Sequence, residues 1–197
     1  MEFRKDYRIL IYGPDTINRE AKPIWEEDYQ DLPKLREYMI EVMKKANGIG
    51  LAAPQIGVFK QFIIVEKQNG EKVDYVNPEV TRLYGKEYEQ EEGCLSMPPG
   101  GNECLVPRLQ FVDIVAGTTV NPQKETKYSL KMMTARVVQH EIDHLFGTFF
   151  IDRVPEKRRR LVLERFHFWK STQNGNIKEG MYDARIVAAN RGQSRLS

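Results

Sequence analysis

The stretch SLKMMTARVVQHEIDHL, residues 129–145, repeats apolar side chains at helical spacing and holds two of the chain's three histidines. Residues four apart on a helix lie one turn above one another, so His140 and His144 can direct their imidazoles at a single point. Met133 and Val137 precede them on the same stripe, which makes that stripe the inward-facing one. The pattern predicts a buried helix that carries two metal ligands, with the rest of the chain packed around it.

The two ends of this helix and its acidic residues carry further signals. Ser129 is available as a cap, and Gly147 lies just beyond the other end. Glu141 follows the first histidine in the order HExxH, a specific arrangement whose acid suits a general base acting on metal-bound water. Two core histidines satisfied by hydrogen bonds are the structural alternative. For Asp143 we expect a surface acid, with the orientation of a ligand histidine as the alternative.

The segments around the central helix predict an α+β fold. Residues 31–46 form one amphipathic helix, and residues 155–170 form a second, opened by Pro155. Short runs rich in Val, Ile, Tyr and Phe, separated by Gly, Pro and Asn, predict strands of a mostly antiparallel sheet. These runs are QFIIV (61–65), DYVNPEV (74–80), LYGKEYEQ (83–90), LQFVDIVAGTTV (109–120) and TFFIDRV (148–154). Mostly antiparallel sheets packed around a metal-binding helix are therefore expected.

Length and composition indicate one domain. The 197 residues, 41% of them hydrophobic, suffice for one sizeable core. We expect the domain to cover residues 1–170, with residues 8–24 as a short strand and a wrapping arm. Residues 171–197 are polar and contain three glycines, which predicts a flexible tail.

Charge is distributed unevenly. Residues 153–170 carry seven Lys and Arg against two Asp and Glu, whereas the whole chain has a net charge of only +2. A basic segment on an acidic body favours an anionic partner such as RNA, and a solvated helix face is the common alternative. No run approaches the roughly 18 apolar residues of a membrane span, and the first ten residues lack a secretory apolar core. A cytoplasmic protein with neither a DNA partner nor a membrane partner is expected.

The third protein ligand of a catalytic metal is not given by the helix itself. No histidine follows at the metzincin position, and His167 lies in the basic segment, where a helix-surface role is expected. Glu156 and Glu164 are downstream acids outside any recognisable motif. Cys94, in EEGCLSMP (91–98), offers a strong thiolate ligand, although a buried inert cysteine is the alternative.

A third stretch, GIGLAAPQIG at 48–57, contains three glycines, a proline and one glutamine. Glycine lets a backbone approach a ligand closely, and the Gln55 amide can donate a hydrogen bond. Taken alone, the stretch predicts a turn.

The three motifs together resemble those of peptide deformylases. GIGLAAPQIG, EGCLS (92–96) and QHEIDHLFG (139–147) occur in the family's order, and YGPDTINREAKPI (12–24) is similar to its N-terminal segment. The resemblance covers roughly residues 7–154. It implies hydrolysis of the formyl group from the N-terminal formylmethionine of new polypeptides by a metal-bound hydroxide.

The resemblance also implies roles for single residues. The metal ligands are Cys94, His140 and His144, and the ion is Fe(II) in the cell, with Zn, Ni or Co able to replace it. Glu141 acts as general base and acid. The developing oxyanion is held by the Gln55 amide, the Leu95 backbone N–H and the metal. Substrate-binding positions are Ile49, Gly50, Met133 and Val137, of which Gly50 pairs with the substrate backbone as with an added strand.

One segment departs from the family pattern. The link SMPPGGNECLVPR (96–108) is longer than in many bacterial members and has Glu103 and Cys104 near the place of an arginine, so the contacts to the downstream part of the substrate stay open. We expect a structural role for Cys104. The protein is expected to be a monomer. Two rival functions remain: a metallopeptidase that cuts internal bonds, and a non-catalytic protein that binds nascent chains or ribosomes.

Overall fold

A computed structural model describes residues 6–13, 16–98, 103–173 and 175–185. Its helices are α1 (Leu32–Lys45), α2 (Met132–Leu145) and α3 (Glu156–Ser171), with short 3₁₀ helices η1 (Glu26–Asp31), η2 (Ala53–Ile56) and η3 (Phe150–Arg153). Its strands are β1 (Arg8–Leu10), β2 (Gly50–Ala52), β3 (Phe62–Glu66), β4 (Lys72–Glu92), β5 (Cys104–Gly117), β6 (Thr126–Lys131) and β7 (Met181–Asp183). The predicted α+β class is confirmed, and α1 and α3 lie within a residue or two of their expected limits.

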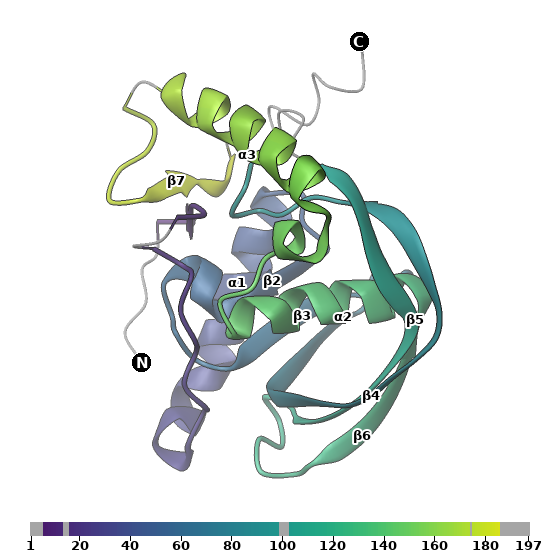
Figure 1. The fold of residues 1–197 in the computed structure, drawn as a ribbon. Coiled ribbons are helices and arrows are strands. Elements are labelled where there is room, and N and C mark those ends of the chain that lie inside the picture. The colour runs from purple at the N-terminus through teal and green to yellow at the C-terminus, as the bar shows by residue number, and fades with distance from the viewer. Residues whose placement is uncertain (1–5, 14–15, 99–102, 174, 186–197) are drawn as a thin grey trace.

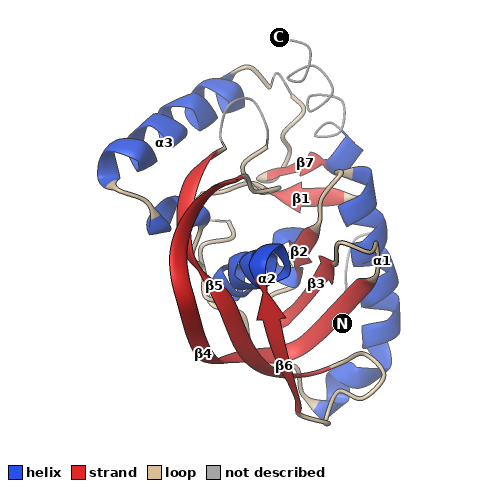
Figure 2. Ribbon diagram, turned by 90° about the vertical axis from the view of Figure 1, so that its right-hand side faces the viewer, coloured by secondary structure: helices blue, strands red, loops and turns tan. Residues whose placement is uncertain are grey.

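A curved antiparallel sheet surrounds α2. Its five strands run in the order β2-β3-β4-β5-β6, and Figures 1 and 2 show them wrapped around the helix, with α1 on the outer side of the sheet. Three register shifts interrupt the pairing of β4 with β5, at Val76/Glu79, Val80/Arg82 and Tyr84/Glu87. Such bulges bend a strand and increase its twist, which allows one long hairpin to curve around a helix.

The start of α2 differs from the expected one. Ser129 lies in β6, where it pairs with Asp113 of β5, and the helix begins at Met132. Met132 has a positive φ of 51°, so the chain turns there directly from strand to helix. The prediction that Ser129 caps the helix was therefore wrong, because this residue is paired in β6, three residues before α2 begins.

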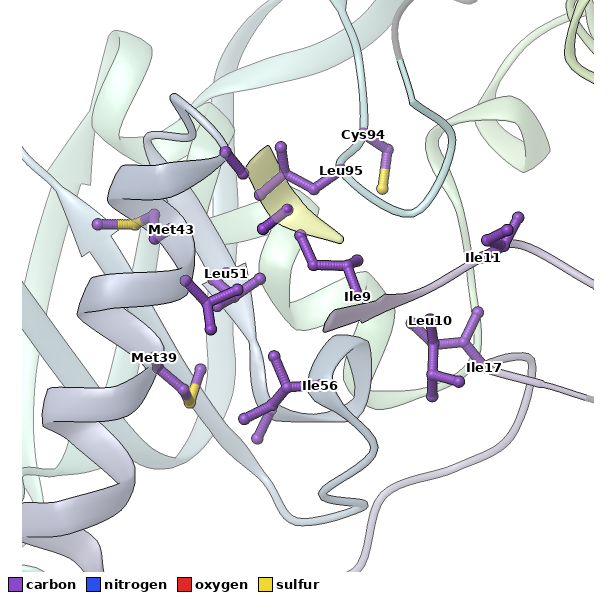
Figure 3. Close-up of a cluster of buried hydrophobic side chains, with 14 of the residues drawn as sticks. Ile9, Leu10, Ile11, Ile17, Met39, Met43, Leu51, Ile56, Cys94 and Leu95 are labelled. Carbon is purple, nitrogen blue, oxygen red and sulfur yellow. The ribbon is translucent and has the colours of Figure 1, made fainter. Parts of the chain in front are cut away.

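Two apolar cores hold the layers together. One fills the space between α2 and the concave face of the sheet, with Ile63, Val65, Val112, Ile114 and Val138 among its members. The other joins α1 to the N-terminal segment and the C-terminal elements. Figure 3 shows part of this second core, where side chains of α1, β1, β2 and η2 gather beside the turn that carries Cys94 and Leu95. The candidate site thus borders both cores.

Residues 148–154 do not form the predicted strand. Phe149, Phe150 and Ile151 are all fully buried, so this segment has no solvent-facing alternate residues of the kind that a half-buried strand needs. The chain instead makes a 3₁₀ turn, which begins where Asp152 accepts a hydrogen bond from the Phe149 N–H at 2.9 Å.

The C-terminal segment contains a strand that the sequence did not reveal. Residues 171–197 were expected to form a flexible tail, but β7 pairs antiparallel with β1, and Tyr182 is 1% exposed. Because the segment is mostly polar, its composition did not indicate that Met181, Tyr182 and Ala184 belong to the second core. Residues 186–197 of the predicted tail lie outside the described residues. None of the helices in the described part of the chain has both the length and the apolar character to cross a membrane.

Gly147 allows the N-terminal segment to cross the end of α2. Its φ is +68°, and a Cβ added there would lie 2.9 Å from the backbone N of Arg19 and 3.0 Å from the backbone C of Asn18. Beside this crossing, the Ala21 N–H donates to the Leu145 carbonyl at 2.7 Å. The wrapping course of the N-terminal segment depends on this close approach.

We predict that Gly147→Ala lowers the free energy of unfolding by roughly 2–4 kcal/mol, since a steric clash is added to an unfavourable backbone conformation. Gly70→Ala is the matched control, because Gly70 has a φ of +82° and no atom within 4 Å of an added Cβ. It should lose only about 1 kcal/mol. Urea unfolding of both variants measures the difference, and equal losses would show that the crossing does not require glycine.

Candidate metal centre

Three buried side chains converge between β4 and α2. The Cys94 thiol and one ring nitrogen each of His140 and His144 all lie within 4.8 Å of one another. The Cys94 Sγ and His144 Nε2 atoms are 3.2 Å apart. Bonds of about 2.0 Å to nitrogen and 2.3 Å to sulfur would place the one sulfur and two nitrogen ligands of a tetrahedral ion roughly 3.3–3.5 Å apart. The donor set and its spacing fit a divalent transition metal.

The turn after β4 brings Cys94 to the helix. Strand pairing continues to Glu92, which lies opposite Cys104. The chain then closes a tight turn in which the Met97 N–H donates to the Cys94 carbonyl at 3.0 Å. Tyr12, on the N-terminal segment, donates its N–H to the Ser96 carbonyl at 2.7 Å. The thiol is therefore placed by the β4–β5 hairpin and by the N-terminal segment together.

Glu92 orients the first histidine. Its Oε2 atom lies 3.0 Å from His140 Nδ1, which leaves Nε2 to face Cys94 and His144. Burial lowers the pKa of His140, but hydrogen bonds with Cys94 and Glu92 outweigh this effect and raise the pKa well above its usual value. A cation at the centre would replace the Nε2 proton, since metal ligation requires the deprotonated nitrogen.

The second histidine is already suited to ligation. Burial and the positive charge of His140 lower the pKa of His144 well below its usual value. Its imidazole is therefore neutral, which is the form that binds a metal.

A network of buried charges surrounds Glu92. Arg108 binds both carboxylate oxygens, at 2.6 and 2.9 Å, and Arg136 binds Oε1 at 2.5 Å. Burial raises the pKa of Glu92, but His140 and Arg108 outweigh it and lower the pKa to about 2. The carboxylate is thus ionised at every pH at which the protein is expected to work.

Asp143 belongs to the same network. It was expected to be a surface acid, yet it is 7% exposed and accepts a hydrogen bond from Arg108 at 2.9 Å. Arg153 binds it from the outer side. The expectation failed because the i,i+3 relation to His140 places Asp143 on the inward side of α2.

Glu92, Arg108 and Arg136 are site residues that motif reasoning missed. A signal existed for Glu92, because it stands two residues before Cys94, and alternate residues of an extended chain face the same side. The two arginines gave no local signal. Each reaches Glu92 only because β5 and α2 lie on either side of the end of β4.

The general-base candidate lies against a glycine. An added Cβ on Gly50 would be 2.3 Å from Glu141 Oε1, so only glycine leaves room for the carboxylate there. The Oε2 atom is buried and has no hydrogen-bond partner among the described residues. Burial raises the pKa of Glu141 to about 7, against the lowering effect of His140. This carboxyl group can therefore both accept and release a proton near neutral pH in the metal-free protein.

Gln55 holds a fixed orientation beside the thiol. Its Oε1 atom accepts a hydrogen bond from the Ala52 N–H at 2.8 Å, which turns Nε2 toward Ser96 Oγ at 3.2 Å and Cys94 Sγ at 3.7 Å. Leu95 lies in the same turn and is 5% exposed. An amide donor and a backbone turn thus border the ligand group.

A cavity of about 330 Å³ opens onto this group. Every residue proposed from the sequence for catalysis or substrate binding lines it, namely Ile49, Gly50, Gln55, Leu95, Met133, Val137 and Glu141. His140 joins them from the ligand set, and Asn47, Glu91 and Arg136 are lining residues that the sequence did not suggest.

The other sequence candidates lie elsewhere. His167, Glu156 and Glu164 are on α3 and are exposed, and Glu164 faces Arg160 at 3.6 Å. Cys104 begins β5, and burial raises the pKa of its thiol to about 11. It is not part of the three-ligand group found among the described residues. The link after Cys94 includes residues 99–102, which lie outside the described part of the chain.

Comparisons of the sequence with known families and proteins agree with the geometry. The sequence model of the polypeptide deformylase family matches residues 6–160. The peptide deformylase of Thermodesulfovibrio yellowstonii is 41% identical over 162 residues, which cover 80% of this chain and 94% of that protein. The enzyme of Thermotoga maritima is 36% identical over 159 residues, with coverage of 81% and 93%.

Solved structures give the same result. The crystal structure of peptide deformylase from Thermus thermophilus aligns with a TM-score of 0.74 and 33% identity, covering 83% of this chain and 96% of that one. A plant peptide deformylase aligns with a TM-score of 0.78 and 33% identity, covering 88% and 95%. The fold, the matched sequence length and the convergent ligand group show that this chain belongs to the peptide deformylase family.

Proposed function

We propose that Cys94, His140 and His144 hold the divalent ion with which this peptide deformylase removes the N-formyl group from N-terminal formylmethionine of newly made polypeptides. The observation that supports these roles most strongly is the convergence of the three ligand atoms within 4.8 Å, beside the buried Glu141 carboxylate. When bound, the ion supplies Lewis-acid chemistry that makes water a nucleophile at neutral pH.

Glu141 moves the protons of the reaction. Its carboxylate accepts a proton from the attacking water and delivers a proton to the nitrogen of the leaving amine, so that formate and a free N-terminus are the products. The position against Gly50 supports this role, because it points Oε1 at the backbone that borders the cavity. The buried Oε2 has no hydrogen-bond partner among the described residues, so no contact described there competes for a proton on this oxygen.

Gln55 and Leu95 stabilise the oxyanion that develops on the formyl group. The Gln55 Nε2 atom is held toward Cys94 by the hydrogen bond that Ala52 donates to Oε1. The Leu95 backbone N–H belongs to the turn that carries the thiol. Preorganised donors of this kind each lower the barrier by about 3 kcal/mol.

The substrate enters as an extended peptide. Gly50, in the edge strand β2, offers backbone hydrogen bonds that do not depend on the peptide's sequence. Ile49, Met133 and Val137 supply the apolar lining for a methionine side chain. Ile49 is 50% exposed, as expected for a residue at the rim of the cavity.

We predict that Glu141→Gln keeps its metal and loses formate release from a formyl-methionyl peptide by about 10²–10⁴-fold, since the amide cannot transfer a proton. Metal content is measured on the same sample. Wild-type protein should leave the unformylated twin peptide intact, whereas cleavage of internal bonds in both peptides would favour a metallopeptidase. An active Glu141→Gln variant would remove Glu141 as the base.

We predict that Glu92→Gln weakens metal binding by about 10–100-fold, because the neutral amide fixes the His140 ring less firmly and raises the basicity of its ligand nitrogen less than the carboxylate does. Glu89→Gln on the same strand is the control, since Glu89 makes an exposed ion pair with Arg158. Competition against a chelator measures both dissociation constants. Equal affinities would show that the carboxylate at position 92 serves stability alone.

The identity of the ion is proposed from the family resemblance. A Cys, His, His donor set accepts several divalent ions, so that availability in the cell matters as much as affinity. We propose Fe(II) as the cellular ion, with Zn, Ni or Co able to take its place in a purified sample. Elemental analysis of anaerobically purified protein distinguishes these ions.

We propose further that α3 contacts ribosomal RNA. Val162, Phe166 and Trp169 anchor the helix in the core, and Lys157, Arg160 and Lys170 are exposed. A helix held in this way presents its positive charge to solvent, as phosphate binding requires. The protein acts in the cytoplasm and as a monomer in this proposal.

We predict that Lys157→Glu with Arg160→Glu weakens co-sedimentation with ribosomes by about tenfold at low salt. Lys124→Glu with Lys127→Glu is the control, since both lysines are exposed near β6 and the change in net charge is the same. A chain that ends at residue 154 is unsuitable, because it would expose the core that α3 covers. Equal co-sedimentation of both variants would contradict the RNA contact.

A further inference from the structure

Strand β7 reaches the turn that carries the metal ligand. The Tyr182 hydroxyl donates a buried hydrogen bond to the carbonyl oxygen of Leu95, 87 residues earlier in the chain. Figure 3 shows β7, in yellow, beside Leu95 and the strand that carries Ile9. The family match ends at residue 160, so this contact comes from a part of the chain that the match does not cover.

Several contacts fix the position of Tyr182 itself. It lies opposite Ile9 in the β1–β7 pairing, and its ring meets that of Trp169 edge-on at 6.2 Å. The Ile11 N–H donates to the Gly180 carbonyl at 2.8 Å at one end of β7, and the Ala184 N–H donates to the Tyr7 carbonyl at 2.8 Å at the other. The hydroxyl therefore extends from a strand that is held at both ends.

The turn at residues 94–97 is held from three sides. Tyr12 binds the Ser96 carbonyl, Gln55 binds the Ser96 hydroxyl, and Tyr182 binds the Leu95 carbonyl. The bond from Tyr182 acts on the peptide group next to the Leu95 N–H. The Leu95 N–H belongs to the Cys94–Leu95 peptide group, whose planar carbonyl accepts the hydrogen bond from the Met97 N–H at 3.0 Å. With Tyr182 bound to the carbonyl of the Leu95–Ser96 group, both peptide groups that meet at the Leu95 Cα are held, which restricts the rotation that would turn the N–H away from the cavity.

We propose that Tyr182 is a positioning residue for deformylation, which holds the Cys94–Leu95 turn so that the thiol faces the metal site and the Leu95 amide faces the oxyanion. This inference rests on the proposed roles of Cys94 and Leu95. It gives β7 an indirect role in catalysis, although no residue of this strand lines the cavity. A purely structural bond would stabilise the fold and leave catalysis unchanged.

The first test is the Tyr182→Phe variant, which keeps the ring against Trp169 and removes only the hydroxyl. With formyl-methionyl peptide as substrate, kcat should fall roughly tenfold while KM stays within about twofold, because a donor for the transition state is displaced rather than a substrate contact removed. Tyr84→Phe is the matched control. Its hydroxyl binds Asp113 at 3.2 Å on the outer hairpin, so its kcat should equal that of the wild type.

The second test needs no turnover. Co(II) added to the metal-free proteins gives visible ligand-field bands and near-ultraviolet thiolate charge-transfer bands, and the titration should show a dissociation constant several-fold higher for Tyr182→Phe than for the wild type and Tyr84→Phe. Amide hydrogen exchange should be faster at Leu95 and Ser96 in Tyr182→Phe, with unchanged exchange in α2. Unchanged α2 exchange also shows that the variant is folded.

The outcomes separate this inference from the proposed function. Unchanged kcat, Co(II) affinity and Leu95 exchange in Tyr182→Phe, with only a lower melting temperature, would overturn the positioning role while formate release by the wild type upholds the proposed function. A wild type that releases no formate would overturn the proposed residue roles. The Co(II) titration and the amide exchange would still decide whether Tyr182 holds the turn.

Discussion

The site depends on the contacts of one buried carboxylate, that of Glu92. It is buried at the end of β4 and binds Arg108 from β5 and both Arg136 and His140 from α2. One anion therefore ties the hairpin that supplies the thiol to the helix that supplies the imidazoles. Removal of one partner from such a buried cluster leaves uncompensated charge, which is costly. The geometry of the ligand group and the packing of the sheet on α2 are consequently fixed by the same contacts.

The charges around Glu92 also shift the pKa values of the two histidines in opposite directions. His140 lies next to the carboxylate, while His144 has no carboxylate partner for its Nδ1 among the described residues and is kept neutral by burial and by His140. Arg108 and Asp143 continue the cluster outward to Arg153 at the surface. Positive and negative groups alternate along this line, so the interior carries many charges without a large unbalanced field.

Short patterns in the sequence predicted the two histidines and the fold class, whereas the addition of Cys94 to the ligand group came from the resemblance to the peptide deformylase family. Two histidines four apart need only a helix to meet, and the apolar stripe ahead of them showed which face is buried. The position of Ser129 in β6 could not be read in this way, since strand pairing with Asp113 decides it. The arginines at 108 and 136 and the hydroxyl of Tyr182 act across long sequence separations, and no local pattern announces such contacts.

The construction of the turn explains why a longer link after Cys94 is compatible with the ligand group. The hydrogen bond from Met97 N–H to the Cys94 carbonyl closes the turn at the start of the link, and the pairing of Cys104 with Glu92 restores the hairpin within it. Gln55 approaches the thiol itself, while Tyr12 and Tyr182 bind the backbone carbonyls of the turn that carries it. The turn that carries the candidate thiol ligand is therefore held by contacts that do not depend on the length of the link beyond Met97.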